Sequence, residues 1–237
     1  MITIVCWLWK NSKLSYTYKP EYVDVLTSMF KRHLTIPHQI VCITDEPASS
    51  FTSNVIILPT PDEARKLNDL QTPEGNGFPT CYRRLWLFSE QARVLGSRIF
   101  LTDLDIVLVN NVDSVFNKNS DFVGWQAPGG SNSWGSNFFV GCLWQLRTGS
   151  RTQVWDDFVK DPKKAISDAR GAGFRGSDQA WISYKLFKKE EKFKHEDGIY
   201  LFNRYDGKNP ANAKIIQFNG NHKPWHSSVS WVKDNWK

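Results

Sequence analysis

The sequence lacks several features that would assign it quickly to a class of protein. None of its four cysteines belongs to a Cys-x-x-Cys pair, so nothing indicates a structural zinc site. No stretch approaches the roughly 20 consecutive apolar residues of a membrane-spanning helix. The first ten residues, MITIVCWLWK, lack the basic leader and cleavage site of a secretion signal. From these absences we expect a cytoplasmic protein with reduced cysteines.

The sequence also lacks long runs of charged residues of the same sign. The 237 residues carry a net charge of +6, which suits an anionic ligand such as a nucleotide diphosphate, a nucleic acid or an acidic membrane. No run of five basic residues occurs, and the basic residues alternate with acids, which argues against nucleic acid as a partner. The tail from residue 225 carries three of the eleven Trp residues. We expect it either to dock on the protein or to make a peripheral contact with an anionic membrane.

The apolar pattern predicts an α/β protein. It places helices between strands in the first half, with strands at 2–8, 39–44, 54–58 and 99–109 and helices at 22–33 and 82–95. This alternation is typical of a mostly parallel, Rossmann-like sheet flanked by helices. After Asn110 the pattern loosens and predicts a mixed, partly antiparallel part, with strands at 121–126, 136–146 and 214–218 and helices at 153–160 and 177–187. No linker divides the chain, so we expect one domain over 1–237.

Two acids lie inside the apolar run IFLTDLDIVLV at 99–109. Side chains two apart on a strand share a face, so Asp103 and Asp105 are expected to point the same way. Neighbouring carboxylates in a low-dielectric environment stay charged only if a cation or an array of donors compensates them. A divalent cation is the simplest such group, and it points to phosphate chemistry. An Asp-x-Asp pair taken alone is usually a surface pair or a cap, and the apolar setting makes a cation site and that alternative about equally plausible here.

Two further segments place polar residues, which could bind a ligand, next to the end of a predicted strand or the start of a predicted helix. In QFNGNHKPW at 217–225, Gly220 allows a positive φ or a close approach of backbone to a ligand, and Lys223 could bind a phosphate oxygen. The alternative is a plain turn with a surface lysine. In GSDQ at 176–179, Asp178 and Gln179 either face a polar ligand or simply begin a helix that Ser177 caps.

Aromatic and amide side chains suggest where a ligand could rest. Trp7 lies at the end of the first predicted strand, where it could stack on a base or pack in the core. Asn137 follows a glycine-rich loop at 128–135. Such a loop could contact a donor sugar or an acceptor, and the alternative is a surface hairpin.

Four blocks of the sequence, in this order, resemble the glycogenin-like sugar transferases of glycosyltransferase family 8. They are YRRL at 82–85, the segment FLTDLDIVLVNNVDSVF at 100–116, DQ at 178–179 and FNGNHKPW at 218–225. The resemblance implies a GT-A fold, with a nucleotide-binding half at 1–118 and a sugar and acceptor half at 119–237. It also implies a nucleotide-sugar donor, most often a UDP-sugar, a Mn²⁺ or Mg²⁺ ion, and retention at the anomeric carbon.

The resemblance also implies roles for individual residues. Asp103 would bridge the ribose and the metal ion, and Asp105 would bind the metal. Arg84 would contact the donor, and Lys223 would neutralise the leaving diphosphate. Asp178 would touch the transferred sugar, with Gln179 positioning it.

The third metal ligand is where this sequence departs from the family. The family has a His at the position that Gln217 occupies here. An amide oxygen is a neutral ligand that Mn²⁺ or Mg²⁺ accepts, and His222 in the same loop could take its place.

Two other classes of function stay open at this point. The Gln217 substitution favours a nucleotide-sugar or carbohydrate-binding protein without catalysis. A metal-dependent nucleotidyltransferase or nuclease would need a third carboxylate near the acid pair. For a transferase, the acceptor could be a glycan, a lipid-linked sugar or a protein hydroxyl.

Overall fold

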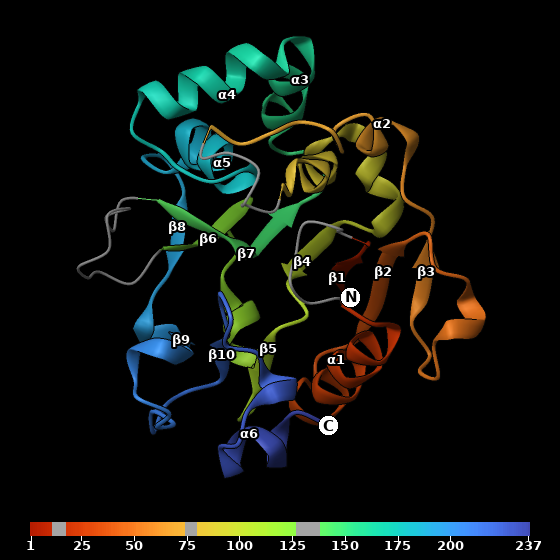
Figure 1. The fold of residues 1–237 in the computed structure, drawn as a ribbon, viewed down its shortest axis with the longest axis vertical. Helices are drawn as coiled ribbons and strands as arrows, with labels where there is room; N and C mark the ends of the chain where they lie inside the picture. Colours follow the sequence, from red (N-terminus) through yellow and green to blue (C-terminus); the bar gives the residue numbers. More distant parts are fainter. Residues whose placement is uncertain (11–17, 74–79, 127–137) are drawn as a thin grey trace.

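A computed structural model describes residues 1–10, 18–73, 80–126 and 138–237. Within these residues a seven-stranded sheet has the order β3-β2-β1-β4-β7-β6-β8 (Figure 1). Its neighbouring strands are parallel except where β7 pairs with β4 and β6. The bounds are β1 Ile2–Leu8, β2 His38–Thr44, β3 Ile56–Leu58, β4 Arg98–Thr102, β6 Phe122–Gln126, β7 Phe139–Arg147 and β8 Glu191–Phe193. The expected α/β architecture with a mostly parallel sheet is confirmed.

A second, three-stranded sheet has the order β5-β10-β9. Its strands are β5 Ile106–Leu108, β10 Ile215–Gln217 and β9 Ile199–Leu201. The helices are α1 Pro20–His33, α2 Asp62–Arg65, α3 Gln153–Lys160, α4 Pro162–Gly171, α5 Asp178–Leu186 and α6 Ser230–Asn235. Single 3₁₀ turns lie at Ala48–Ser50, Asp113–Asn117, His195–Asp197, Phe202–Arg204 and Pro224–His226, and two longer 3₁₀ stretches at Tyr82–Phe88 and Glu90–Leu95.

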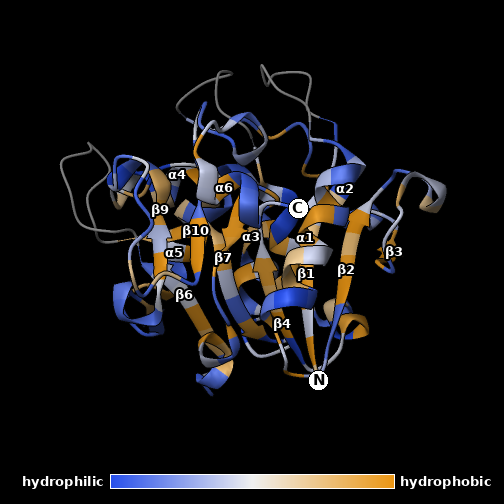
Figure 2. Cartoon of the chain, turned by 90° about the horizontal axis from the view of Figure 1, so that it is seen from below, coloured by the Kyte–Doolittle hydropathy of each residue, from blue (hydrophilic) through white to orange (hydrophobic). Residues whose placement is uncertain are grey.

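The interior strand β1 shows why the sheet lies in the middle of the molecule. All seven of its residues are buried, and they alternate between two apolar clusters. Ile4 and Cys6 pack on the side of α1, whereas Val5 and Trp7 pack on the side that α3 and α5 cover. A strand buried on both faces needs apolar residues throughout, which explains the uninterrupted run at 2–8. Figure 2 shows the same pattern, with hydrophobic strands in the middle and hydrophilic residues on the outer faces of the helices.

The C-terminal tail is docked on the protein. Arg32, in the last turn of α1, donates hydrogen bonds to the carbonyl oxygens of Asn235 and Lys237. The rings of Trp225, Trp231 and Trp236 are half-buried against the cluster on the α1 side. The structure therefore has the docked arrangement that the sequence allowed. Among the described helices, none combines the length and the apolar character needed to cross a membrane.

Two expected elements differ from the structure. The run at 99–109 is not one strand, because it divides into β4 in the large sheet and β5 in the small one. Asp103 and Asp105 lie in the connection, so they do not share a strand face as predicted. The prediction of an α-helix at 82–95 is wrong. The segment forms two 3₁₀ stretches, and the extended backbone of Ser89 separates them. Division of the chain at residue 118 stays a prediction.

Candidate functional site

The candidate site lies where the carboxyl ends of β1 and β4 meet. These strands are parallel neighbours, so the residues that follow them, Trp9 and Asp103, reach the same edge of the sheet. A pocket at this edge is lined by Trp7, Trp9, Tyr18, Arg84, Asp103 and Leu104. Ligands of open α/β sheets bind at this kind of edge.

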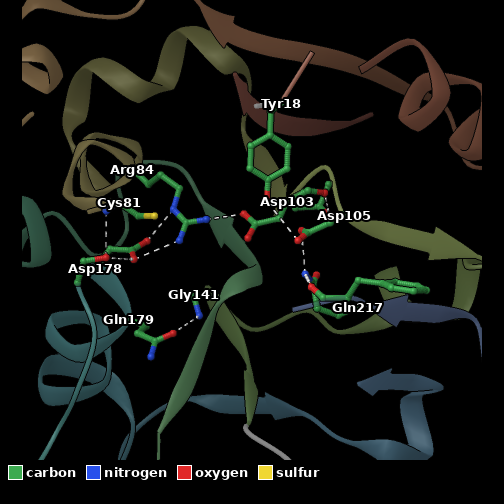
Figure 3. A network of polar contacts seen from close by, with 12 residues as sticks. Tyr18, Cys81, Arg84, Asp103, Asp105, Gly141, Asp178, Gln179 and Gln217 are labelled. Carbon is green, nitrogen blue, oxygen red and sulfur yellow. Dashed lines mark hydrogen bonds and ion pairs between the residues drawn. The ribbon is translucent and has the colours of Figure 1, made fainter. Parts of the chain in front are cut away.

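Arg84 connects two carboxylates from distant parts of the chain (Figure 3). Its Nε and Nη2 atoms donate to the two oxygens of Asp178 at 2.8 and 3.1 Å. Its Nη1 atom donates to Oδ1 of Asp103 at 2.5 Å. The side chains of Arg84 and Asp178 are 6% and 2% exposed, whereas that of Asp103 is 33% exposed. Arg84 therefore fixes Asp103 at the pocket wall while Asp178 stays beneath it.

The start of α5 positions Asp178. The Ser177 hydroxyl donates to Oδ1 of Asp178 at 3.2 Å and accepts a hydrogen bond from the backbone N–H of Cys81 at 3.0 Å. Ser177 occupies the N-cap position but its side chain makes no cap hydrogen bond, so the capping alternative is not supported. Gly141 on β7 leaves room for the pair, because a Cβ there would lie 3.1 Å from Nη2 of Arg84 and 3.2 Å from Oδ1 of Asp178.

Asp105 is held by a different set of donors. The Lys223 ammonium lies 2.5 Å from its Oδ2 atom, to which the Tyr18 hydroxyl also donates at 3.2 Å. Nε2 of Gln217 donates to Oδ1 of Asp105 at 3.0 Å and to the carbonyl oxygen of Phe218 at 2.6 Å. Both oxygens of Asp105 are therefore bonded within the protein, and its side chain is 4% exposed.

The charges at the site do not balance. Three carboxylates, Asp103, Asp105 and Asp178, face two cations, Arg84 and Lys223. Burial raises the pKa of Asp103 and Arg84 opposes it; with the carboxylates of Asp105 and Asp178 also raising it, the pKa lies at about 6. With all five groups charged, the cluster has a net charge of minus one, so a diphosphate would be repelled unless another cation joined it.

The donor atoms at the site fit a divalent cation. Asp103, Asp105 and the amide of Gln217 supply the oxygen ligands that Mg²⁺ and Mn²⁺ take. The Oε1 atom of Gln217 is buried without a hydrogen-bond partner, so this oxygen is available if the amide turns. Among the described residues, no group of three or more His, Cys, Asp or Glu side chains is arranged around a single point. A metal site here would therefore depend on the glutamine.

Aromatic rings form the other wall of the pocket. Trp7 and Trp9 pack edge to face with ring centroids 6.5 Å apart, and the guanidinium of Arg83 lies 4.5 Å from the centroid of Trp9. Trp7 is 6% exposed and belongs to the core, but it also lines the pocket, and its buried indole N–H has no partner. Trp7 therefore packs in the core and also lines the pocket, so core packing does not exclude a contact with a bound base.

The remaining predicted residues are placed as follows. Gly220 adopts the left-handed conformation that favours glycine, with a φ of +57°, and nothing lies within 4 Å of where a Cβ would be. His222 is exposed, with its ring centroid 6.2 Å from that of Phe202. Oε1 of Gln179 accepts from the backbone N–H of Gly141 at 3.4 Å. Asn137 lies outside the described residues.

Sequence reasoning missed Tyr18 and assigned Cys81 no role. In the sequence, Tyr18 belongs to a polar, tyrosine-rich segment that follows the first strand, and this position after a carboxyl strand end was the available signal. Cys81 lies beside the pair of Arg84 and Asp178, but burial raises its pKa to about 12. A thiol with this pKa stays protonated at neutral pH and is a poor nucleophile.

The third carboxylate required for a nuclease or nucleotidyltransferase exists, since Asp178 is linked to the acid pair through Arg84. Its two oxygens are bonded to the guanidinium of Arg84, however, which stands between Asp178 and Asp103 in the place of a shared metal ion. The geometry therefore gives that class of function no support.

Comparison with solved structures identifies the class of fold. The galactosyltransferase LgtC in complex with donor and acceptor sugar analogues superposes with a TM-score of 0.66 at 9% identity, over 99% of this chain and 96% of that chain. An LgtC active-site mutant, glutamine to glutamate, matches with a TM-score of 0.65 at 9% identity, over 97% of this chain and 91% of that chain. No protein-family model and no curated protein matches the sequence. The chain thus has the expected GT-A fold, and closer kinship with glycogenin stays a prediction.

Proposed function

We propose that this protein is a metal-dependent glycosyltransferase. It would transfer a sugar from a nucleotide-sugar donor, most simply a UDP-sugar, to a hydroxyl acceptor. The observation that carries this proposal is the convergence of Asp103, Asp105, Arg84, Asp178 and Lys223 beside an aromatic pocket at the carboxyl edge of a GT-A sheet. Loss of a nucleoside diphosphate needs positive charge next to the pocket, which these residues and a bound cation supply together.

The cation would be held by Asp103, Asp105 and Gln217. When bound, it would stabilise the negative charge that develops on the leaving diphosphate. Lys223 and Arg84 add positive charge at the same place. His222 serves this set less well because its ring packs toward Phe202 on the exposed side of the loop.

Asp178 and Gln179 belong to the sugar side of the proposed site. A carboxylate near the anomeric carbon stabilises the positive charge that builds up there as the bond to the diphosphate breaks. Asp178 is bonded to Arg84 and buried, so it would act through its field or after Arg84 turns toward the donor. Gln179 lies at the first turn of the same helix and would orient the sugar.

The acceptor and the stereochemistry rest on the fold and the resemblance together. The LgtC complex contains donor and acceptor sugar analogues, which supports a glycan as the acceptor here. Retention of configuration follows from the resemblance to glycosyltransferase family 8. Lipid-linked sugars and protein hydroxyls are tested as acceptors in the same assay.

A nucleotide-sugar-binding protein without catalysis is the second candidate. It is favoured by one observation, that both oxygens of Asp105 are already bonded by donors of the protein. Such a protein would bind the donor and not turn it over. The two candidates therefore differ in a measurable rate.

The test begins with a thermal-shift screen of nucleotide sugars with and without Mn²⁺. A ligand that binds only the folded form raises the melting temperature. The nucleotide sugar with the largest shift is then followed for hydrolysis and for transfer to glycan acceptors. We expect Mn²⁺-dependent turnover that falls at least about a hundredfold in Asp105→Asn, and unchanged turnover in Lys185→Met, whose partner Asp157 lies on the distant helix α3.

Binding without turnover in every donor and acceptor combination would favour the binding protein. A shift that does not depend on Mn²⁺ would overturn the metal-dependent transferase, and the absence of any nucleotide-sugar shift, with or without Mn²⁺, would overturn both candidates. Proton NMR of the transferred sugar reports the anomeric configuration, and an inverted product would remove retention from the proposal.

A further inference from the structure

We infer that the Lys223 ammonium is a built-in counter-ion of Asp105 that leaves its place when a divalent cation binds. This inference rests on the proposed function and adds regulation to it, because cation binding and release of the lysine become a single event. Lys223 would then be unavailable to a diphosphate until the cation is bound.

The position of Lys223 carries the first step of the argument. Its side chain is 3% exposed, and its Nζ atom is 2.5 Å from an Asp105 side chain that is 4% exposed. A buried lysine stays charged only with close compensation, and Asp105 provides it. The ammonium thus occupies the side of Asp105 that a divalent cation would need.

The surroundings of the Lys223 ammonium form a binding environment that stabilises a positive charge. The Nζ atom lies 5.5 Å from the ring centroid of Tyr18 and 5.8 Å from that of Trp225. It also donates to the Tyr18 hydroxyl at 3.3 Å. Aromatic faces and a carboxylate together favour a positive charge, so removal of the lysine without replacement is unfavourable.

Asp103 is more exposed to solvent than Asp105, and this difference sets the order in which a cation would contact the two carboxylates. Asp103 is 33% exposed at the pocket wall, so an incoming cation reaches this carboxylate first. Coordination by Asp105 then requires that the ammonium withdraws, because two cations on one buried carboxylate repel each other strongly. Gln217 would turn at the same time, presenting its unpartnered Oε1 atom in place of Nε2.

The segment that carries Lys223 has room to move. Nothing lies within 4 Å of the position of a Cβ on Gly220, three residues earlier, and the backbone there has a φ of +57°. His222 is exposed. The exposed residues 219–222 can therefore shift without losing packing, whereas Pro224 is buried and Trp225 stacks on Tyr22. The ammonium would move by rotation of the Lys223 side chain together with this exposed part of the loop.

The first experiment measures binding of Mn²⁺ alone to the whole protein, without nucleotide, by electron paramagnetic resonance of free Mn²⁺. We expect Lys223→Met to bind Mn²⁺ at least about tenfold more tightly than wild type, because no internal cation competes. Tyr18→Phe should bind with intermediate affinity. Lys185→Met is the matched control, since Lys185 pairs with Asp157 and should leave Mn²⁺ affinity unchanged.

The second experiment uses wild-type protein and does not depend on the folding of a variant. Lysines are acetylated with acetic anhydride, and the extent of modification at Lys223 is measured by mass spectrometry. We expect Lys223 to be protected without metal and to react several-fold faster with Mn²⁺. Protection that is the same with and without bound Mn²⁺ overturns the exchange.

Failure of the inference is distinguishable from failure of the proposed function. If Asp105→Asn abolishes Mn²⁺ binding while Lys223→Met binds no more tightly than wild type, the metal site stands and the exchange is wrong. If Asp105→Asn binds Mn²⁺ as wild type does, Asp105 is not a ligand and the proposed metal site itself is wrong.

Discussion

The Lys223 ammonium and the Asp105 carboxylate form an ion pair with a separation of 2.5 Å, and both side chains are almost completely buried. The pair connects the β4–β5 connection to the loop after β10, across 118 residues of sequence. Because water cannot solvate either group, each depends on the other for compensation.

A double-mutant cycle on this pair should show strong coupling. Lys223→Met or Asp105→Asn alone leaves one buried group without its partner, and we expect each to lower the free energy of unfolding by about 3 kcal/mol or more. The double variant should lose much less than the sum of the two. Urea denaturation in the absence of metal measures all four proteins, and additive losses would mean that the two groups act independently.

The raised pKa of Asp103 makes the metal-free protein less stable as pH rises. A carboxyl whose pKa is about 6 in the native state and lower when unfolded contributes stability below the unfolded pKa and loses it as pH passes 6. We expect the stability of wild type relative to Asp103→Asn to fall by about 1–2 kcal/mol between pH 4 and 7, a value reduced because the side chain is a third exposed.

Asp24 provides a control of opposite sign. Burial raises the pKa of this carboxyl, but hydrogen bonds from Ser53 and Thr52 outweigh burial and lower it. Its contribution is therefore present above the unfolded pKa and lost as pH falls. Asp24→Asn should cost stability at pH 7 and little at low pH, measured in the same EDTA-containing denaturation series. A parallel response of the two variants would contradict the assignment to Asp103.

The sequence predicted most strands of the central sheet because each is a buried apolar run with clear ends. It could not predict the break inside 99–109, where apolar residues continue on both sides of the acids. The break comes from pairing with distant partners, since β4 pairs with β1 and β7 while β5 pairs with β10. Such long-range choices leave no trace in local periodicity.

The candidate site was predictable as a set of residues but not as a set of contacts. The sequence pointed to Asp103, Asp105, Asp178, Arg84 and Lys223, and the structure brings all five together. It gave no reason to pair Arg84 with two carboxylates or Lys223 with Asp105. These pairings arise because burial forces each charge to find the nearest opposite charge, whichever segment supplies it.

Tyr18 is a further residue whose contribution the structure defines. Its hydroxyl donates to Asp105 and accepts from Lys223, so Tyr18→Phe removes one hydrogen bond at each group. The ring packing against Trp225, with centroids 5.5 Å apart, would remain. We expect a loss of about 1–2 kcal/mol in the free energy of unfolding, measured by urea denaturation. Tyr184→Phe, at a residue 42% exposed, should change it by a few tenths of a kcal/mol at most.

Gly141 tests whether the packing around Arg84 and Asp178 matters for function as well as for stability. A Cβ at this position would lie 3.1 to 3.2 Å from atoms of Arg84, Asp178 and Gln179, closer than such contacts normally are. We expect Gly141→Ala to lower the free energy of unfolding by about 1–2 kcal/mol and to weaken nucleotide-sugar binding, because the bidentate pair must shift.

Gly171→Ala is the matched control, since a Cβ at the end of α4 meets nothing within 4 Å. Alanine is the better helix former, so this variant should be neutral or slightly more stable. Thermal melting and the thermal shift with nucleotide sugar are measured on both variants. If Gly141→Ala matches wild type in melting temperature and in ligand shift, the prediction is wrong. Arg84 and Asp178 can then make room for a Cβ at residue 141 without loss of stability or of nucleotide-sugar binding.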